Sequence, residues 1–135
     1  MLGKILLTVS ATALIFASPM ADYNHTHIFN PRWPPHAKFH TGQTITLSIA
    51  LGLMTLFLTY RPDLASTSPR DAQILRKESL KLAAFTGSIY WLAGLAAYFF
   101  PGADGLDPEF GGPGFPQGPV FGGLGFCALL GGWLG

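Results

Sequence analysis

Four apolar stretches, separated by polar or glycine- and proline-rich segments, dominate the chain. They cover residues 2–17, 44–60, 80–100 and 120–134. A helix needs about 20 apolar residues to cross the hydrocarbon core of a bilayer. The third stretch reaches this length, and the others are shorter. The pattern predicts an all-α fold, an integral membrane bundle of four transmembrane helices that forms one domain over residues 1–135.

Prolines and capping residues set the expected helix limits. Pro35 can occupy the first turn of a helix, where its missing N–H is harmless, and this extends the second helix backward. Ser68 as N-cap, Pro69 and Asp71 form a helix start ahead of the third stretch. Pro19 disfavours continuation of the first helix beyond its predecessor. The expected helices are residues 2–18, 35–60, 69–100 and 119–134.

The first stretch has an alternative interpretation as a cleaved signal peptide, because Lys4 precedes an apolar run that ends in small residues. The cleavage pattern is poor. A cut after Ala21 would place Pro19 at the −3 position. A cut after Ala17 would place Ile15 there, although this position requires a small residue. We therefore expect an uncleaved first helix.

Composition supports a membrane location and excludes nucleic-acid binding. Charged residues make up 11% of the chain, against roughly 25% in ordinary soluble proteins. The net charge is only +1, and the scattered cations form no basic module of the kind that binds nucleic acids. The single cysteine, Cys127, lies in an apolar run and indicates nothing about redox compartment.

The cationic residues predict an orientation. Six of the eight lie on one face of the predicted topology, so the positive-inside rule places both termini and the loop between the second and third helices in the cytosol. Residues 19–34 and 101–119 then face the lumen or exterior. In a eukaryotic cell we expect the endoplasmic reticulum membrane. The six residues are Lys4, Arg61, Arg70, Arg76, Lys77 and Lys81.

Polar and small residues form stripes along the predicted helices. Such stripes should face the bundle interior, because unpaired polar groups in hydrocarbon are costly. Glycine pairs four residues apart in the fourth helix, Gly118/Gly122 and Gly131/Gly135, allow close packing within the bundle or with another membrane helix. One stripe comprises His36, His40, Gln43, Thr44, Ser48, Gly52, Thr55 and Thr59. Its partner on the third helix comprises Ser79, Ala83, Thr86, Gly87, Tyr90 and Gly94.

All four histidines, His25, His27, His36 and His40, fall within sixteen residues. Three interpretations remain open. The imidazoles could bind zinc together, with Asp22 or Glu109 as an oxygen ligand. One or two could instead act as general acid and base, because imidazole titrates near neutral pH. They could also be interfacial side chains that bind loop backbone or lipid head groups, like the neighbouring Trp33 and Tyr23.

The segment that carries these histidines is distinctive. Asn24, His25 and Thr26 form a glycosylation sequon, which lies close to the first helix, where Asn24 is instead expected to tie down the start of the loop. The run His25-Thr-His-Ile-Phe-Asn-Pro-Arg-Trp-Pro-Pro-His-Ala-Lys-Phe-His40, followed by Thr41-Gly-Gln-Thr, resembles the signature of a family of small uncharacterised polytopic membrane proteins, common in fungi and also found in bacteria. Members are sometimes labelled acetyltransferases, although the chain has no acyl-carrier or acetyl-coenzyme motif. The resemblance implies four helices and an important histidine loop, and it implies no reaction.

The preferred functional hypothesis is a small membrane enzyme that acts on membrane lipids or another lipophilic small molecule by acid/base isomerisation, cyclisation or a transfer. The alternatives are a non-catalytic accessory or scaffold subunit and, third, a small transporter. No ionisable residue lies near the middle of a span, which weakens the transporter hypothesis. The expected catalytic residues are His36 and His40, with Glu109 as a further candidate. The expected substrate contacts are His25, His27, Trp33, Gln43 and Thr44.

Overall fold

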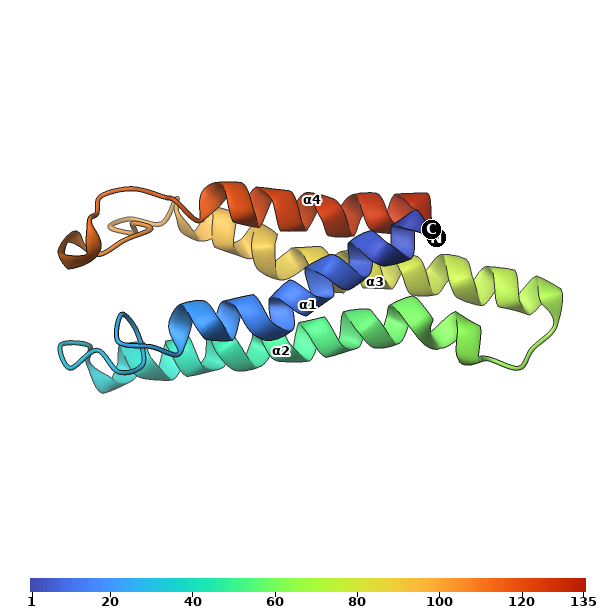
Figure 1. The fold of residues 1–135 in the computed structure, drawn as a ribbon, viewed down its shortest axis with the longest axis horizontal. Coiled ribbons are helices and arrows are strands. Elements are labelled where there is room, and N and C mark those ends of the chain that lie inside the picture. The colour runs from blue at the N-terminus through green and yellow to red at the C-terminus, as the bar shows by residue number, and fades with distance from the viewer.

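The computed structural model describes residues 1–135 and contains four α-helices, one short 3-10 helix and no strand. The four long helices run alternately in opposite directions along one bundle (Figure 1). This confirms the predicted all-α four-helix architecture. The elements are α1 (Leu2–Asp22), α2 (Pro35–Leu64), α3 (Pro69–Ala97), η1 (Pro108–Phe110) and α4 (Gly118–Leu134).

The two ends of the bundle differ in what they carry (Figure 1). One end, here named the loop end, holds the connections 23–34 and 98–117. The opposite end, named the terminal end, holds both chain termini and the short connection 65–68. Four of the seven acidic residues belong to the loop end, namely Asp22, Asp104, Asp107 and Glu109.

The predicted start of α3 is confirmed. The backbone N–H of Asp71 donates to the Ser68 hydroxyl oxygen at 3.3 Å, and the Ser68 hydroxyl donates to the Asp71 carboxylate at 2.7 Å. Pro69 follows at the first helical position, where a missing N–H leaves no carbonyl without a partner. The start of α2 at Pro35 is likewise as predicted.

Three predicted helix ends are wrong by a few residues. α1 passes through Pro19 and ends at Asp22, because Pro19 lies in the last turn and its carbonyl still accepts the N–H of Tyr23 at 2.8 Å. α2 likewise continues through Pro62 to Leu64, because a proline near a helix end removes only one backbone hydrogen bond. α3 ends at Ala97, and residues 98–100 form turns. The first connection is therefore 23–34 and not 19–34.

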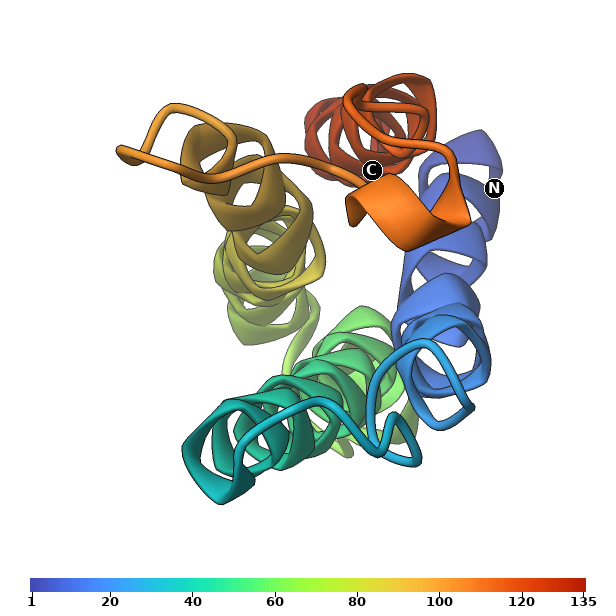
Figure 2. The same ribbon diagram turned by 90° about the vertical axis from the view of Figure 1, so that its left-hand side faces the viewer.

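The helices stand around a ring, as the view along the bundle shows (Figure 2). α1 contacts α2 and α4, and α3 also contacts α2 and α4. α1 and α3 touch across the ring, whereas α2 and α4 do not meet. The two long connections therefore sit together at the loop end, above the space that the four helices surround.

Small and hydroxyl-bearing residues fill the centre. Thr55 of α2 and Thr86 of α3 join through their hydroxyl oxygens at 2.8 Å, and both are buried. Gly52 packs so closely against α1 that a Cβ there would lie 2.8 Å from the Ala11 carbonyl oxygen. An apolar cluster lies beside these contacts and contains Leu7, Leu58, Leu80, Ala83 and Ala128.

The predicted polar stripe on α2 is only half correct. From Ser48 to Thr59 its members are buried, as predicted. Its other four members, His36, His40, Gln43 and Thr44, are exposed, which contradicts the expectation that they are buried in the bundle. Thr41 is the buried residue of α2 nearest the loop end.

Large apolar side chains cover the outside of the bundle. Only 23 of the 135 residues are buried. Phe16, Phe57, Phe85 and Phe126 are each about 60% exposed, an arrangement that lipid favours and water does not. α1, α2 and α3 are long and apolar enough to cross a membrane, and α4, with 17 residues, is a shorter apolar helix.

Candidate functional site

A cavity of about 790 Å³ lies at the loop end and is bordered by all four long helices and both connections. Its walls are mainly small and aromatic residues, with Tyr98, Phe115 and Phe121 on one side. Ligand sites typically have this volume and this combination of apolar walls with few polar groups. The polar side chains along the cavity are Ser18, Asp22, Thr26, His27, Thr44, Tyr90, Asp104 and Gln117.

Asp22 and His27 form the one acid/base pair in this cavity. Asp22 is the last residue of α1, and His27 follows in the 23–34 connection. The His27 Nε2 lies 3.7 Å from the Asp22 carboxylate oxygen. Both side chains are partly buried. A carboxylate and an imidazole at this distance interact electrostatically without a hydrogen bond between them.

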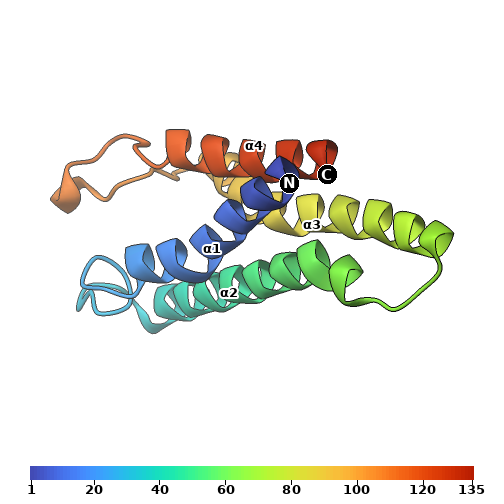
Figure 3. The same cartoon turned by 45° about the vertical axis from the view of Figure 1, so that its right-hand side comes forward.

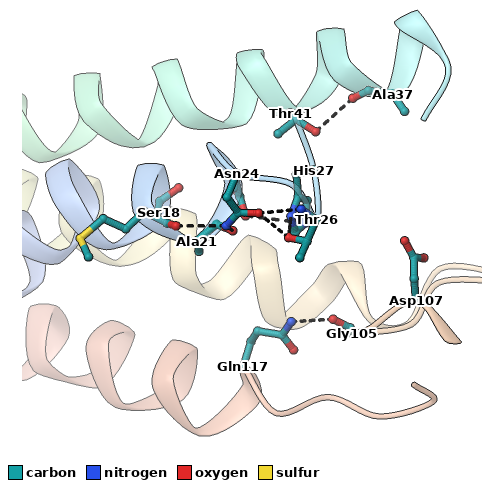
Figure 4. Close-up of polar contacts among 12 residues, drawn as sticks. Ser18, Ala21, Asn24, Thr26, His27, Ala37, Thr41, Gly105, Asp107 and Gln117 are labelled. Atoms are coloured by element: carbon teal, nitrogen blue, oxygen red, sulfur yellow. Dashed lines mark hydrogen bonds and ion pairs between the residues drawn. The ribbon is translucent and has the colours of Figure 1, made fainter. Parts of the chain in front are cut away.

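Hydrogen bonds from the preceding residues orient His27 (Figure 4). Asn24 donates to the Ala21 carbonyl oxygen at 2.7 Å and so closes the end of α1. The Thr26 hydroxyl donates to the Asn24 amide oxygen at 2.7 Å and lies 2.7 Å from the His27 Nδ1. Because that hydroxyl proton is already used, Nδ1 is the donor to Thr26. Nε2, which lies 3.7 Å from the Asp22 carboxylate, is then the unprotonated ring nitrogen.

Trp33 connects His27 to the second connection. The Trp33 ring meets the His27 ring edge to face, with centroids 4.9 Å apart. Its indole N–H donates to the Asp107 carboxylate at 3.4 Å. Beside it, Glu109 accepts from the Asn30 amide at 3.1 Å and pairs with Arg32. Glu109, predicted as a catalytic candidate, thus joins the two connections and does not line the cavity.

Gln117 is a cavity residue that the sequence did not single out. Its amide N–H donates to the Gly105 carbonyl oxygen at 2.5 Å. Its amide oxygen is buried and has no hydrogen-bond partner, and it is the one side-chain atom of this kind in the protein. Buried polar atoms are normally paired, so this acceptor is an exception among the residues that line the cavity. The signal available in the sequence was an amide placed directly before an apolar helix.

The remaining histidines lie elsewhere. His36 and His40 contact each other through Nε2 at 3.0 Å, and the His40 Nδ1 lies 3.2 Å from the Gln43 amide oxygen. This group is exposed on the first turns of α2, outside the cavity. His25 is exposed beside Phe110. Of the predicted contacts, only His27 and Thr44 line the cavity.

The four-histidine zinc site is not assembled. No group of three or more His, Cys, Asp or Glu side chains that could hold a metal ion is present. The spacing of the histidines suggested one shared metal site. In the structure, two of them lie on the 23–34 connection and the other two lie on α2, which begins after it. The histidines therefore divide into an exposed pair, an exposed single residue and the cavity residue His27.

Comparison with known proteins places the chain in one family. Residues 6–132 match the model of a family of unknown function (DUF6640), so the chain belongs to this family. No curated protein and no solved structure matches the chain.

Proposed function

We propose that this member of the DUF6640 family binds a lipophilic molecule in the loop-end cavity and moves a proton on it, with His27 and Asp22 as the acid/base pair. The observation that carries the proposal is the position of these two side chains together on a cavity that is otherwise largely apolar. This replaces His36 and His40 as the preferred catalytic residues, because both lie outside the cavity.

The walls support a lipophilic ligand. Thirteen of the 22 residues around the cavity are hydrophobic, and the helices that frame it expose aromatic side chains on their outer faces. A molecule that partitions into the bilayer could enter between the helices without crossing water. The polar end of the ligand would then lie near the connections, at the level of the membrane surface.

His27 and Asp22 can perform a proton shift with no co-reactant. The His27 Nε2 lone pair accepts a proton from a carbon or hydroxyl of the ligand, and the resulting imidazolium is stabilised by the Asp22 carboxylate 3.7 Å away. The imidazolium then returns the proton to a different atom of the same ligand. No atoms are gained or lost overall, so the reaction class is an isomerisation by proton shift.

Gln117 supports a ligand with a hydrogen-bond donor. Its buried amide oxygen lacks a partner, and a hydroxyl or amino group on the ligand would pair with it once the Gln117 side chain rotates to expose that oxygen to the cavity. Satisfying a buried acceptor avoids a penalty of about 1–3 kcal/mol. A lipophilic alcohol or amine therefore matches the cavity better than a pure hydrocarbon.

The proposal includes a membrane orientation. Six of the eight Lys and Arg belong to the half of the fold at the terminal end, which favours a cytosolic terminal end by the positive-inside rule. All four long helices would then span, and the cavity would open toward the lumen of the endoplasmic reticulum or the exterior.

Photo-crosslinking with a photoactivatable long-chain alcohol tests binding in native membranes. Ala93 lines the cavity and Ala96, three residues along the same helix, does not. We expect Ala93→Phe to block labelling by filling the cavity, whereas the matched Ala96→Phe variant should label like the wild type. Equal labelling of both variants would contradict binding in this cavity.

The chemistry is tested separately by profiling lipids and metabolites of cells that express each variant. We expect His27→Gln and Asp22→Asn to abolish the protein-dependent product while labelling with the alcohol persists. His25→Gln, on the same connection but outside the cavity, is the matched control and should retain the product. If labelling persists and all three variants give the wild-type profile, the protein binds without catalysis, and the accessory-subunit hypothesis replaces the enzyme.

A further inference from the structure

A second hollow lies at the terminal end, far from the loop-end cavity along the bundle. It is an open groove of about 690 Å³ between α3 and the end of α4. Its α3 side carries three cations, Arg76, Lys77 and Lys81. Ala84 and Leu129 form part of an apolar floor, and Trp133 borders it from α4.

The groove has an excess of positive charge. Lys81 pairs with Glu78 at 2.8 Å, but no carboxylate side chain lies within ion-pair distance of Arg76 or Lys77. Both side chains are exposed. Gly135 also borders the groove. Even with Glu78 counted as an anion, the cations remain in excess.

Along α3, the groove lies where charged residues give way to an apolar run. The cations end at Lys81, and the apolar run continues from Leu82 to Phe100. On α4, the 81% exposed indole of Trp133 stands at the matching level, as tryptophans do at the lipid head groups. Arg76 and Ala84 are eight residues apart, about 12 Å along the helix. One groove therefore spans a charged level and an apolar level.

α3 and α4 pack closely beside the groove. α3 projects past the end of α4 at the terminal end (Figure 3). Gly132 lets the two helices approach closely, since a Cβ there would lie 3.0 Å from the Leu80 carbonyl oxygen. Arg76 and Lys77 precede this contact along α3, and both are exposed.

We propose that this groove binds an anionic phospholipid, with the phosphate between Arg76 and Lys77 and the start of an acyl chain over Ala84 and Leu129. The charge complements a phosphate, and basic pockets between membrane helices on the cytosolic side bind acidic lipid head groups. The apolar floor below the cations distinguishes a lipid from a free phosphate. The inference does not depend on the proposed chemistry at His27.

Native mass spectrometry tests the proposal on full-length protein taken from vesicles of phosphatidylcholine mixed with phosphatidylglycerol. We expect the wild type to retain phosphatidylglycerol in preference to phosphatidylcholine. Arg76→Gln/Lys77→Gln should weaken this retention about tenfold or more, because each cation near the surface contributes substantially to anionic-lipid binding. The matched control, Lys38→Gln/Arg70→Gln, removes the same charge from positions outside the groove and should retain the lipid.

Two further measurements test whether the bound phosphate belongs to a lipid and whether the apolar floor contributes to binding. Inorganic phosphate should fail to displace the bound phosphatidylglycerol, and Leu129→Asn should weaken lipid retention although it changes no charge. Displacement by inorganic phosphate, or unchanged retention in Leu129→Asn, would contradict the lipid site. If Arg76→Gln/Lys77→Gln and Lys38→Gln/Arg70→Gln lose the same amount of bound lipid, retention depends only on the overall charge of the protein. That result would overturn the proposal. Thermal unfolding of each variant verifies that it is folded.

Discussion

The indole N–H of Trp91 on α3 donates a 2.9 Å hydrogen bond to the hydroxyl oxygen of Ser10 on α1, and that hydroxyl donates in turn to the Gly87 carbonyl oxygen at 2.9 Å. Trp91 and Ser10 are both buried, and Trp91 also borders the loop-end cavity. The chain of bonds holds α1 against α3 directly beneath that cavity, across the one diagonal of the ring where helices touch.

Replacing Ser10 with alanine should therefore destabilise the bundle. The substitution leaves the buried Trp91 N–H without a partner, and such losses between membrane helices cost about 0.6–1.7 kcal/mol. Ser88→Ala is the matched control, since buried Ser88 bonds only to the Phe85 carbonyl oxygen of its own helix. Thermal unfolding in detergent should show a lower midpoint for Ser10→Ala than for Ser88→Ala, and identical midpoints would refute the inter-helix role.

The close approach of α1 and α2 at Gly52 predicts opposite effects of one substitution at two positions of the same helix. Gly52→Ala would bring a Cβ within 2.8 Å of the Ala11 carbonyl oxygen, and forcing the helices apart should cost roughly 1–3 kcal/mol. Gly42 has no atom near its added Cβ. Gly42→Ala should leave stability unchanged or raise it by up to about 1 kcal/mol through helix propensity. Thermal unfolding of the two variants measures both.

Thr26 is predicted to set the tautomer of His27. Thr26→Val removes the hydroxyl that lies 2.7 Å from Nδ1, so the imidazole loses the partner that keeps its proton there. Nitrogen NMR of histidine-labelled protein should show Nδ1 protonated in the wild type and a shift toward the other tautomer in Thr26→Val. Thr46→Val is the control, because Thr46 bonds only to the Gly42 carbonyl oxygen of its own helix. An unchanged His27 spectrum in Thr26→Val would exclude the positioning role.

Cysteine labelling tests the orientation of the two ends. In a Cys127→Ala background, cysteines at Asp107 and at Thr67 lie at opposite ends of the bundle. We expect a membrane-impermeant thiol reagent to label Thr67→Cys from the cytosolic side and Asp107→Cys from the other side only. Labelling of Asp107→Cys from the cytosolic side alone would reverse the orientation. The mass of the purified chain shows in addition whether the first helix is retained.

The sequence was most informative where a local rule decides the outcome. Ser68, Pro69 and Asp71 begin a helix because each fits its position in the first turn, and no distant contact is needed. The predicted end of α1 before Pro19 was wrong by four residues, because a proline near a helix end removes only one backbone hydrogen bond. Thr55 and Thr86 were assigned correctly to the interior, because a hydroxyl in hydrocarbon requires a partner.

By itself, the sequence determined the four apolar helices, their alternating direction and the uneven distribution of cations, because these depend on hydropathy and on the length of consecutive residues. Only the tertiary structure decided which histidine shares a cavity with a carboxylate. His27 precedes the start of α2 by eight residues and His36 follows it by one, yet His27 lines the cavity whereas His36 is exposed outside it. Gln117, separated from His27 by ninety residues, joins the same cavity because α4 closes the ring against α1. Such contacts depend on where helices end and meet, which no local pattern specifies.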